Sequence, residues 1–256
     1  MNKPEREKQK RFFMTDKNIK LPEIAVIIAM TESGLIGNGD KLPWKSSLDF
    51  EWFKKNTMSW PMIFGRKTAA GMPVFPLRNR PCAVVTNSYD TEIKPAIDNH
   101  GSYLSFGQGP FFNSLGETLR FYKNFDKIFI AGGTTLYNYA MQLKQPWFEL
   151  LGTPNGDKPL VDTIIKTVFP DGYVTGDKYL DNNTIKLMGE PYFKRVSYQE
   201  YRIDSSNTIF NNFTLRHEEN QEIISMPARH KLSKKDTPFS TIRFEIWNRI
   251  NENSGK

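Results

Sequence analysis

Cysteine is nearly absent from the 256-residue sequence, in which Cys82 is the only one. A single thiol cannot form an intrachain disulfide, and it excludes a cysteine-based metal site. The three histidines are too far apart in the sequence to suggest a metal cluster. We therefore expect a protein of the reducing cytoplasm that holds no metal.

Long apolar runs are also missing, since none approaches the roughly 20 residues that span a bilayer. The first residues carry charges of both signs and no apolar stretch, unlike a secretory signal. Glu5, Glu7 and Asp16 also argue against an acid-poor mitochondrial presequence. We expect no membrane partner, and we predict that residues 1–21 form a charged, disordered tail.

Acidic residues are fewer than basic ones, 28 against 35, which gives a formal charge of +7. Much of the excess lies in the N-terminal tail and around Arg229–Lys235. No predicted element interleaves Lys or Arg with aromatic residues as a nucleic-acid surface would. We therefore expect no nucleic-acid partner, and a basic bias also suits an enzyme that binds anionic ligands.

Short apolar runs alternate with helical spacings along the chain. The pattern predicts strands at 24–30, 61–64, 83–86, 127–131 and 163–168. It predicts helices at 48–56, from about 68 to Pro73, at 113–124 and at 136–143. Such alternation indicates an α/β fold with a mostly parallel central sheet and flanking helices. The alternating residues 241–248 predict an antiparallel C-terminal edge strand.

Two later stretches lack this order. Residues 145–160 are rich in Pro, Gly and Asn, and residues 204–238 are polar without clear periodicity. We interpret both as insertions in one domain that spans residues 22–256.

Asp49 is the first candidate for chemistry. It lies in the first turns of a predicted helix beside Phe50, Trp52 and Phe53, so its carboxylate would be desolvated near an aromatic wall. The alternative is that Asp49 only stabilises the helix N-terminus through the helix dipole.

Two glycine turns follow predicted buried strands, Gly65-Arg-Lys-Thr68 and Gly132-Gly-Thr-Thr135. Backbone N–H groups at such turns favour a phosphate, and glycine lets the backbone approach a pyrophosphate closely. Neither turn has the G-x-G-x-x-G pattern, so an ordinary Rossmann domain is disfavoured. A third glycine-rich stretch, residues 34–44, is polar enough to form a lid. Each turn could also be only a tight loop.

Seven segments in sequence resemble the dihydrofolate reductases. They are I-A-V-I-I-A at 24–29, G-L-I-G at 34–37, L-P-W at 42–44, D-F-E-W-F-K at 49–54, I-F-G-R-K-T at 63–68, R-P-C-A-V-V-T at 80–86 and I-F-I-A-G-G-T-T-L-Y at 128–137. The resemblance covers roughly residues 22–180 and 241–249. It implies a single dihydrofolate-reductase-like domain, a monomer of one-carbon metabolism that binds dihydrofolate, NADPH and antifolate-type inhibitors.

The resemblance also implies residue roles. Asp49 corresponds to the acidic residue that binds the pterin and assists protonation at N5, and Thr167 to the threonine that supports it. Leu42 and Trp44 correspond to lid residues with a catalytic part. Further substrate-binding positions are Ile27, Phe50, Phe53, Met72 and Arg80, of which Arg80 would hold the α-carboxylate of the glutamate tail.

Cofactor positions follow in the same way, and the family joins the paired glycines by a cis peptide. The implied NADPH-binding residues are Ala29, Ile36, Gly37, Gly65, Arg66, Lys67, Thr68, Thr86, Asn87, Gly132, Gly133, Thr134, Thr135, Leu136 and Tyr137.

Some residues depart from the family pattern. Asn87 stands where many relatives have an arginine toward the 2′-phosphate, which leaves Arg66 and Lys67 to select NADPH over NADH. Ala131 replaces a larger aliphatic residue before the glycine pair.

Two other functions compete with this one. A reductase of the same fold could act on a ribosylaminopyrimidine in riboflavin synthesis, but it would need neither Asp49 nor the lid tryptophan and would grip a phosphate in place of Arg80. A non-catalytic RNA- or protein-binding relative would be expected to have lost Asp49, Thr167 or the glycine pair.

Overall fold

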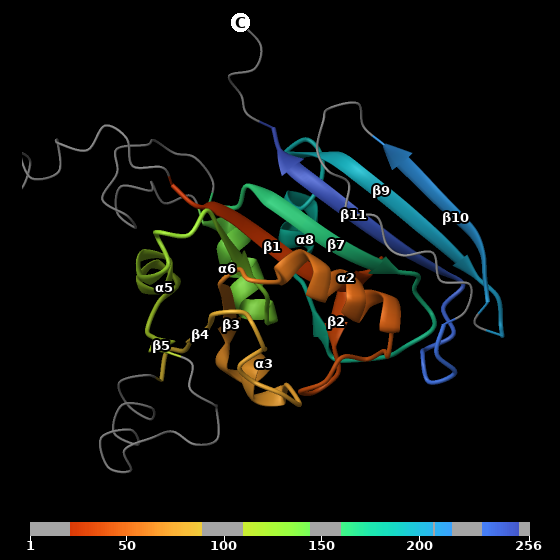
Figure 1. The fold of residues 1–256 in the computed structure, drawn as a ribbon, viewed down its shortest axis with the longest axis horizontal. Helices are drawn as coiled ribbons and strands as arrows, with labels where there is room; N and C mark the ends of the chain where they lie inside the picture. The colour runs from red at the N-terminus through yellow and green to blue at the C-terminus, as the bar shows by residue number, and fades with distance from the viewer. Residues whose placement is uncertain (1–20, 89–109, 144–159, 207, 217–231, 251–256) are drawn as a thin grey trace, which may run out of the picture.

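The structure is a computed structural model that describes residues 21–88, 110–143, 160–206, 208–216 and 232–250. Within these residues nine strands form one sheet in the order β10-β9-β11-β7-β1-β6-β3-β4-β5, and two more strands, β2 and β8, form a small second sheet (Figure 1). No helix in these ranges is long and apolar enough to cross a membrane.

The elements follow one another as the sequence predicts through most of the first half. The strands are β1 (Glu23–Thr31), β2 (Leu35–Gly37), β3 (Met62–Gly65), β4 (Cys82–Val85), β5 (Phe111–Phe112), β6 (Lys127–Ile130), β7 (Thr163–Phe169), β8 (Lys178–Tyr179), β9 (Phe193–Ile203), β10 (Ile209–Arg216) and β11 (Thr241–Arg249). The helices are α2 (Ser47–Thr57), α3 (Arg66–Gly71), α5 (Leu115–Phe121), α6 (Thr134–Gln142) and α8 (Asn182–Leu187).

Both faces of the sheet are covered. One apolar cluster joins the sheet to α2 and α3 through Leu48, Trp52 and Ala69. The other joins it to α5 and α6 through residues such as Leu119 and Ala140, and Figure 1 shows α2 and α8 on opposite sides of the strands. Burial on both faces explains why β1 is almost continuously apolar rather than alternating, and why every residue of β7 is buried, Lys166 and Thr167 included.

The sheet has a parallel half and an antiparallel half. Parallel pairs join β1 to β6 and β7, and β3 to β4 and β6, and β4 to β5. β11 is antiparallel to β7, as expected, but β9 and β10 continue the sheet beyond it. The C-terminal strand is therefore internal, and the antiparallel edge is formed by β10.

The described part of the polar stretch 204–238 contains a strand that the sequence analysis did not predict. Residues 209–216 form β10, in which seven residues pair with β9 despite the weak apolar alternation of the sequence, with a register shift between Ile209 and Asn211. β9, α8 and the short β2, β5 and β8 were also not predicted. The tail before residue 21 and most of the expected insertion at 145–160 lie outside the described residues, so both stay predictions.

Candidate functional site

A crevice is expected where β1 and β6 part. Their pairing ends at Val26–Ile130, while β1 runs on to Thr31 beside β7 alone. The helix after β1, α2, packs on one face, and the helix after β6, α6, packs on the other. Neighbouring parallel strands whose helices leave on opposite faces create a ligand-binding crevice at their carboxyl ends.

Asp49 lies on this crevice's α2 side. Ser46 caps α2 by accepting the Asp49 backbone N–H at 3.2 Å, which places the carboxylate in the first turn. The side chain is only 6% exposed. Burial raises the pKa of Asp49 from 3.8 to about 6, although the Thr167 hydroxyl and the Trp44 indole lower it in part. The carboxyl can therefore hold a proton near neutral pH.

The residues that act on Asp49 are themselves buried. Thr167 is 1% exposed and lies on β7 directly opposite Ala29 of β1. Trp44 is 4% exposed, and its ring packs 4.7 Å from Phe169. The buried Trp44 Nε1 makes no hydrogen bond to any described residue. Its effect on the carboxyl therefore comes from proximity rather than from a formed bond.

Tyr137 closes the crevice from the α6 side. Its hydroxyl donates to the Ile27 carbonyl at 2.7 Å, at the first β1 residue beyond the pairing with β6. Burial, with a smaller contribution from the Asp49 charge, raises the pKa of Tyr137. The phenol therefore stays neutral and holds the edge of β1 in place.

The two predicted glycine turns meet at one junction. The Gly65 N–H donates to the Gly132 carbonyl at 2.6 Å, and the Gly132–Gly133 peptide is cis, as the resemblance implies. Gly132 has a φ of +105°, which disfavours a side chain there. A Cβ on Gly133 would lie 2.7 Å from Thr68 Oγ1. Positions 132 and 133 therefore favour glycine, which leaves the backbone at the end of β6 without side chains.

Cations and hydroxyls follow β3 and β4. Arg66, Lys67 and Thr68 form the start of α3, and Arg66 and Thr68 are half-buried while Lys67 is exposed. Thr86 and Asn87 follow the adjacent β4, where Thr86 is buried and Asn87 is exposed. α3 has only six residues, so its dipole contributes little to the binding of an anion. The cations carry most of the attraction for an anion here.

Arg80 is held at the end of α2. Its Nη1 donates to Thr57 Oγ1 at 3.2 Å, its Nε donates to the Arg78 carbonyl at 3.2 Å, and its guanidinium lies 5.8 Å from the Phe53 ring centre. Partial burial lowers the pKa of Arg80 from its usual value, and a guanidinium nevertheless stays charged at neutral pH. A fixed cation beside an aromatic ring suits a carboxylate attached to an aromatic body.

The predicted apolar wall is only partly enclosed. Ile27 is buried, Phe53 and Met72 are half-buried, and Phe50 and Leu42 are 58% and 45% exposed. Of the remaining predicted positions, Gly37 and Leu136 are buried, Ala29, Ile36 and Thr134 are half-buried, and Thr135 is exposed. The contact roles of these residues remain predictions.

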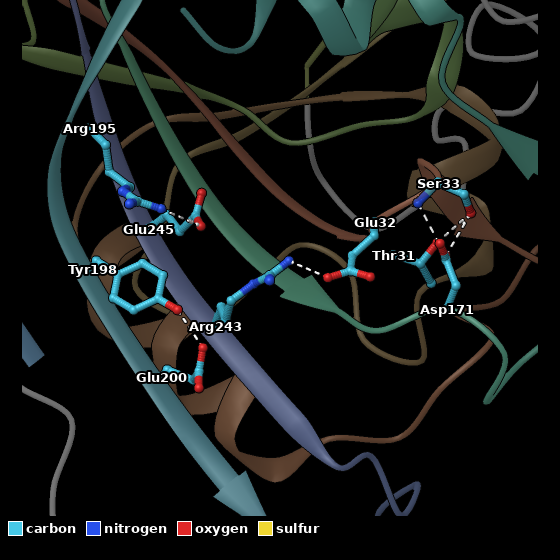
Figure 2. Close-up of polar contacts among 9 residues, drawn as sticks. All are labelled: Thr31, Glu32, Ser33, Asp171, Arg195, Tyr198, Glu200, Arg243 and Glu245. Carbon is cyan, nitrogen blue, oxygen red and sulfur yellow. Dashed lines mark hydrogen bonds and ion pairs between the residues drawn. The ribbon is translucent and has the colours of Figure 1, made fainter. Parts of the chain in front are cut away.

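The glycine-rich stretch is anchored at its root and its middle. Figure 2 shows Asp171 receiving both the backbone N–H and the hydroxyl of Ser33, at 3.1 and 2.7 Å. It also shows Arg243 of β11 reaching Glu32 at 2.7 Å. Farther on, the Gly39 N–H donates to Asp177 at 2.7 Å. The stretch therefore lies against the loop that precedes β8.

The sequence missed another group of residues at the site. Asp236 and Thr237 bond to Ser47 and Lys45 from about 190 residues away, and Phe239 stacks on Phe169, which packs against Trp44. No local pattern signals such a contact, because the stretch around them is polar and aperiodic. Within the described ranges, no group of three His, Cys, Asp or Glu side chains could hold a metal ion.

Comparisons with known proteins identify a family and a fold. The model of the family "Dihydrofolate reductase" matches residues 23–153, just over half of the 256 residues. A dihydrofolate reductase of Buchnera aphidicola is 31% identical over 121 residues, or 46% of this chain and 63% of that protein. One of Mycoplasma pneumoniae is 27% identical over 70% of this chain and 94% of that protein.

A solved structure shares the fold. Dihydrofolate reductase from Enterococcus faecalis, complexed with NADP(H) and RAB-propyl, superposes with a TM-score of 0.57 and 19% identity. The match covers 90% of this chain and 97% of that one. The chain spans less than two thirds of the Buchnera relative's length, but nearly all of the Enterococcus structure.

Proposed function

The chain belongs to the dihydrofolate reductase family, and we propose that it reduces 7,8-dihydrofolate to tetrahydrofolate with NADPH. The observation that carries the proposal is the buried Asp49 with its raised pKa at the crevice between β1 and β6. This family reaction adds a hydride to substrate C6 and a proton to N5, and it leaves NADP⁺.

The residues of the crevice fit a dinucleotide. Gly132 and Gly133 follow β6 and meet Gly65 at the end of β3. Because these residues lack side chains, a pyrophosphate would be able to approach their backbone closely. Arg66 and Lys67 stand beside this junction and would attract phosphates. NADPH, when bound there, supplies the hydride.

Asp49 would manage the proton. Its carboxylate would accept hydrogen bonds from the pterin 2-amino and N3 groups, and its raised pKa would make proton delivery toward N5 favourable near neutral pH. Thr167 would hold the carboxyl from β7, and Trp44 would exclude water from the lid side. Arg80 would pair with the α-carboxylate of the glutamate tail.

Selection of NADPH over NADH would rest on Arg66 and Lys67, since Asn87 is neutral. We also propose that the protein is a monomer and is cytoplasmic. The buried Cys82 thiol, which forms no disulfide, agrees with a reducing compartment. Sedimentation of the purified chain tests the oligomeric state.

The test of the proposed function separates folate chemistry from the rival of the same fold. Purified protein is mixed with NADPH and either dihydrofolate or the phosphorylated ribosylaminopyrimidine, and absorbance follows NADPH oxidation. We expect turnover with dihydrofolate, competitively blocked by an antifolate. Turnover only with the ribosylaminopyrimidine would replace the proposal by the rival, and turnover with neither would favour a non-catalytic relative.

A further inference from the structure

The start of α2 is held by a distant segment, residues 232–240, which we name the 232–240 strap. Asp236 accepts the Ser47 backbone N–H at 3.1 Å on Oδ1 and the Ser47 hydroxyl at 2.6 Å on Oδ2. Ser47 is the first residue of α2, and its N–H has no partner inside the helix. Asp236 therefore acts as a second cap beside Ser46.

The same strap also holds the residue before the cap. The Thr237 N–H donates to the Lys45 carbonyl at 2.8 Å, and the Lys45 N–H donates to Thr237 Oγ1 at 3.0 Å. With the Asp236 contacts, these make four hydrogen bonds to a stretch of three residues. That stretch lies directly between Trp44 and Asp49.

Trp44 is supported by the strap through stacked rings. Phe239 is 1% exposed, and its ring stacks 4.4 Å from Phe169. Phe169 in turn packs 4.7 Å from Trp44. Leu232, at the other end of the strap, is also buried. The strap is thus packed against the core rather than lying loosely on the surface.

We propose that Asp236 is a positioning residue, which holds the start of α2 so that the Asp49 carboxyl stays in its buried place beside Thr167 and Trp44. The inference rests on the proposed function for its catalytic meaning, but the geometry stands without it. Asp49 is two residues after Ser47 and is capped by Ser46, so a shift at Ser47 moves the Asp49 backbone directly.

Replacement of Asp236 should change the environment of Asp49 in one direction. A looser helix start admits water to the carboxyl, and this hydration lowers the pKa of Asp49. The groups that face Asp49 are Thr167 from β7, Trp44 from the lid and Tyr137 from α6. Threonine and tryptophan side chains do not ionise in this range, and burial raises the pKa of Tyr137 above its usual value. None of the three groups therefore titrates between pH 4 and 9.

The test uses carboxyl NMR on aspartate-labelled protein, with the Asp49 signal assigned by its loss in Asp49→Asn. The variants are Asp236→Asn and Ser47→Ala, which remove the acceptor charge and the donor hydroxyl in turn. Asp181→Asn is the matched control, because Asp181 also caps a helix by accepting the Thr184 N–H at 2.5 Å, but at the start of α8 on the opposite side of the sheet from α2 (Figure 1). We expect the pKa of Asp49 to fall by roughly half a unit or more in Asp236→Asn and in Ser47→Ala and to stay unchanged in the control.

Kinetics give the second measurement. With dihydrofolate and NADPH, kcat of Asp236→Asn should fall roughly threefold to tenfold while KM changes less than about twofold. A purely structural role would lower thermal stability and leave both the Asp49 titration and kcat unchanged, and that result would overturn the proposal. If the wild type does not reduce dihydrofolate, the proposed function fails, and the NMR titration still decides the positioning role.

Discussion

At the scale of single residues, burial of the Asp49 carboxylate should lower the stability of the folded state at neutral and alkaline pH. Folding raises the pKa of Asp49 from 3.8 to about 6, so the folded state binds this proton more tightly than the unfolded state. The stability gained is complete below pH 3.8 and is lost as pH rises through about 6. Asp49→Asn should therefore be more stable than the wild type by up to roughly 3 kcal/mol at pH 8.

Urea unfolding of both proteins between pH 4 and 8 measures this difference. The two free energies of unfolding should converge as the pH falls toward 4. A constant gap across that range would show that Asp49 is not held protonated by burial.

Arg80 should matter only for substrates that carry a glutamate tail. We expect Arg80→Leu to raise KM for dihydrofolate about tenfold or more, because a charge-assisted pair is worth roughly 1.5–3 kcal/mol. The KM for a dihydropterin without the tail should hardly change. Arg78→Leu is the matched control, because Arg78 is an exposed neighbour that contributes only its carbonyl to Arg80. Equal losses with both substrates would contradict the assigned role.

The glycine junction should reject even one methyl group. Gly133→Ala places a Cβ 2.7 Å from Thr68 Oγ1, so we expect a loss of roughly 1–3 kcal/mol in stability and weaker NADPH binding. Gly189→Ala serves as the control, because no atom lies within 4 Å of its added Cβ. Calorimetric titration with NADPH and thermal unfolding measure the two effects. Tight NADPH binding by Gly133→Ala would show that the junction does not face the cofactor.

At the scale of elements, β7 carries a buried lysine on the face opposite Thr167. The Lys166 Nζ donates to the Met188 carbonyl at the end of α8 at 2.5 Å and lies 4.6 Å from the Trp247 ring centre. On the neighbouring strands, Figure 2 shows Glu245 paired with Arg195 and Tyr198 bonded to Glu200. Charged and polar side chains therefore lie together on one face of β7, β11 and β9.

This lysine should make stability depend on alkaline pH. Burial lowers the pKa of Lys166 from 10.5 to about 8, although Glu245 opposes the shift. Its contribution to stability is complete above pH 10.5 and is lost as pH falls through about 8. Relative to Lys166→Met, the wild type should therefore gain roughly 3 kcal/mol between pH 7 and 10.5. Guanidinium unfolding across this range tests it, and parallel curves for the two proteins would refute it.

Element prediction succeeded where burial on both faces leaves a strong pattern. The runs at 24–30 and 163–168 became β1 and β7 within a residue or two, and the helix predicted at 48–56 became α2 at Ser47–Thr57. β9 was missed because polar Ser197 and Gln199 occupy buried positions, and β10 because the consecutive Asn211 and Asn212 interrupt its apolar alternation. β11 was expected at the edge because nothing local in 241–248 says which strands lie beyond it.

Site residues, too, could be predicted only where a local pattern or the family resemblance marks them. The glycine turns could be found because backbone geometry demands glycine at Gly132 and Gly133, and most roles at the crevice came from the family resemblance. The pairing of Asp236 with Ser47 could not be found, because its two partners are 189 residues apart. Contacts of that separation depend on the packed sheet rather than on any local pattern.

At the scale of the whole molecule, cofactor binding should raise thermal stability. A ligand that binds only the folded state at 100 times its Kd adds about 2.7 kcal/mol. For a chain of this size that corresponds to a Tm shift of about 5–10 °C. We expect this shift with NADPH and a clearly smaller one with the same concentration of NADH. A variant with both Arg66→Ser and Lys67→Ser should lose the difference, and equal shifts in the wild type would show that these cations do not select the 2′-phosphate.

The central claim is that this chain transfers a hydride to dihydrofolate with Asp49 managing the proton. The most direct test is NADPH oxidation in the presence of dihydrofolate, measured from pH 5 to 9 for the wild type and Asp49→Asn. We predict dihydrofolate-dependent turnover that falls roughly 100-fold or more in the variant at neutral pH, with the loss eased in acid as solvent supplies the proton. No dihydrofolate-dependent turnover in a wild type that binds NADPH, or equal rates in both proteins, would contradict the account.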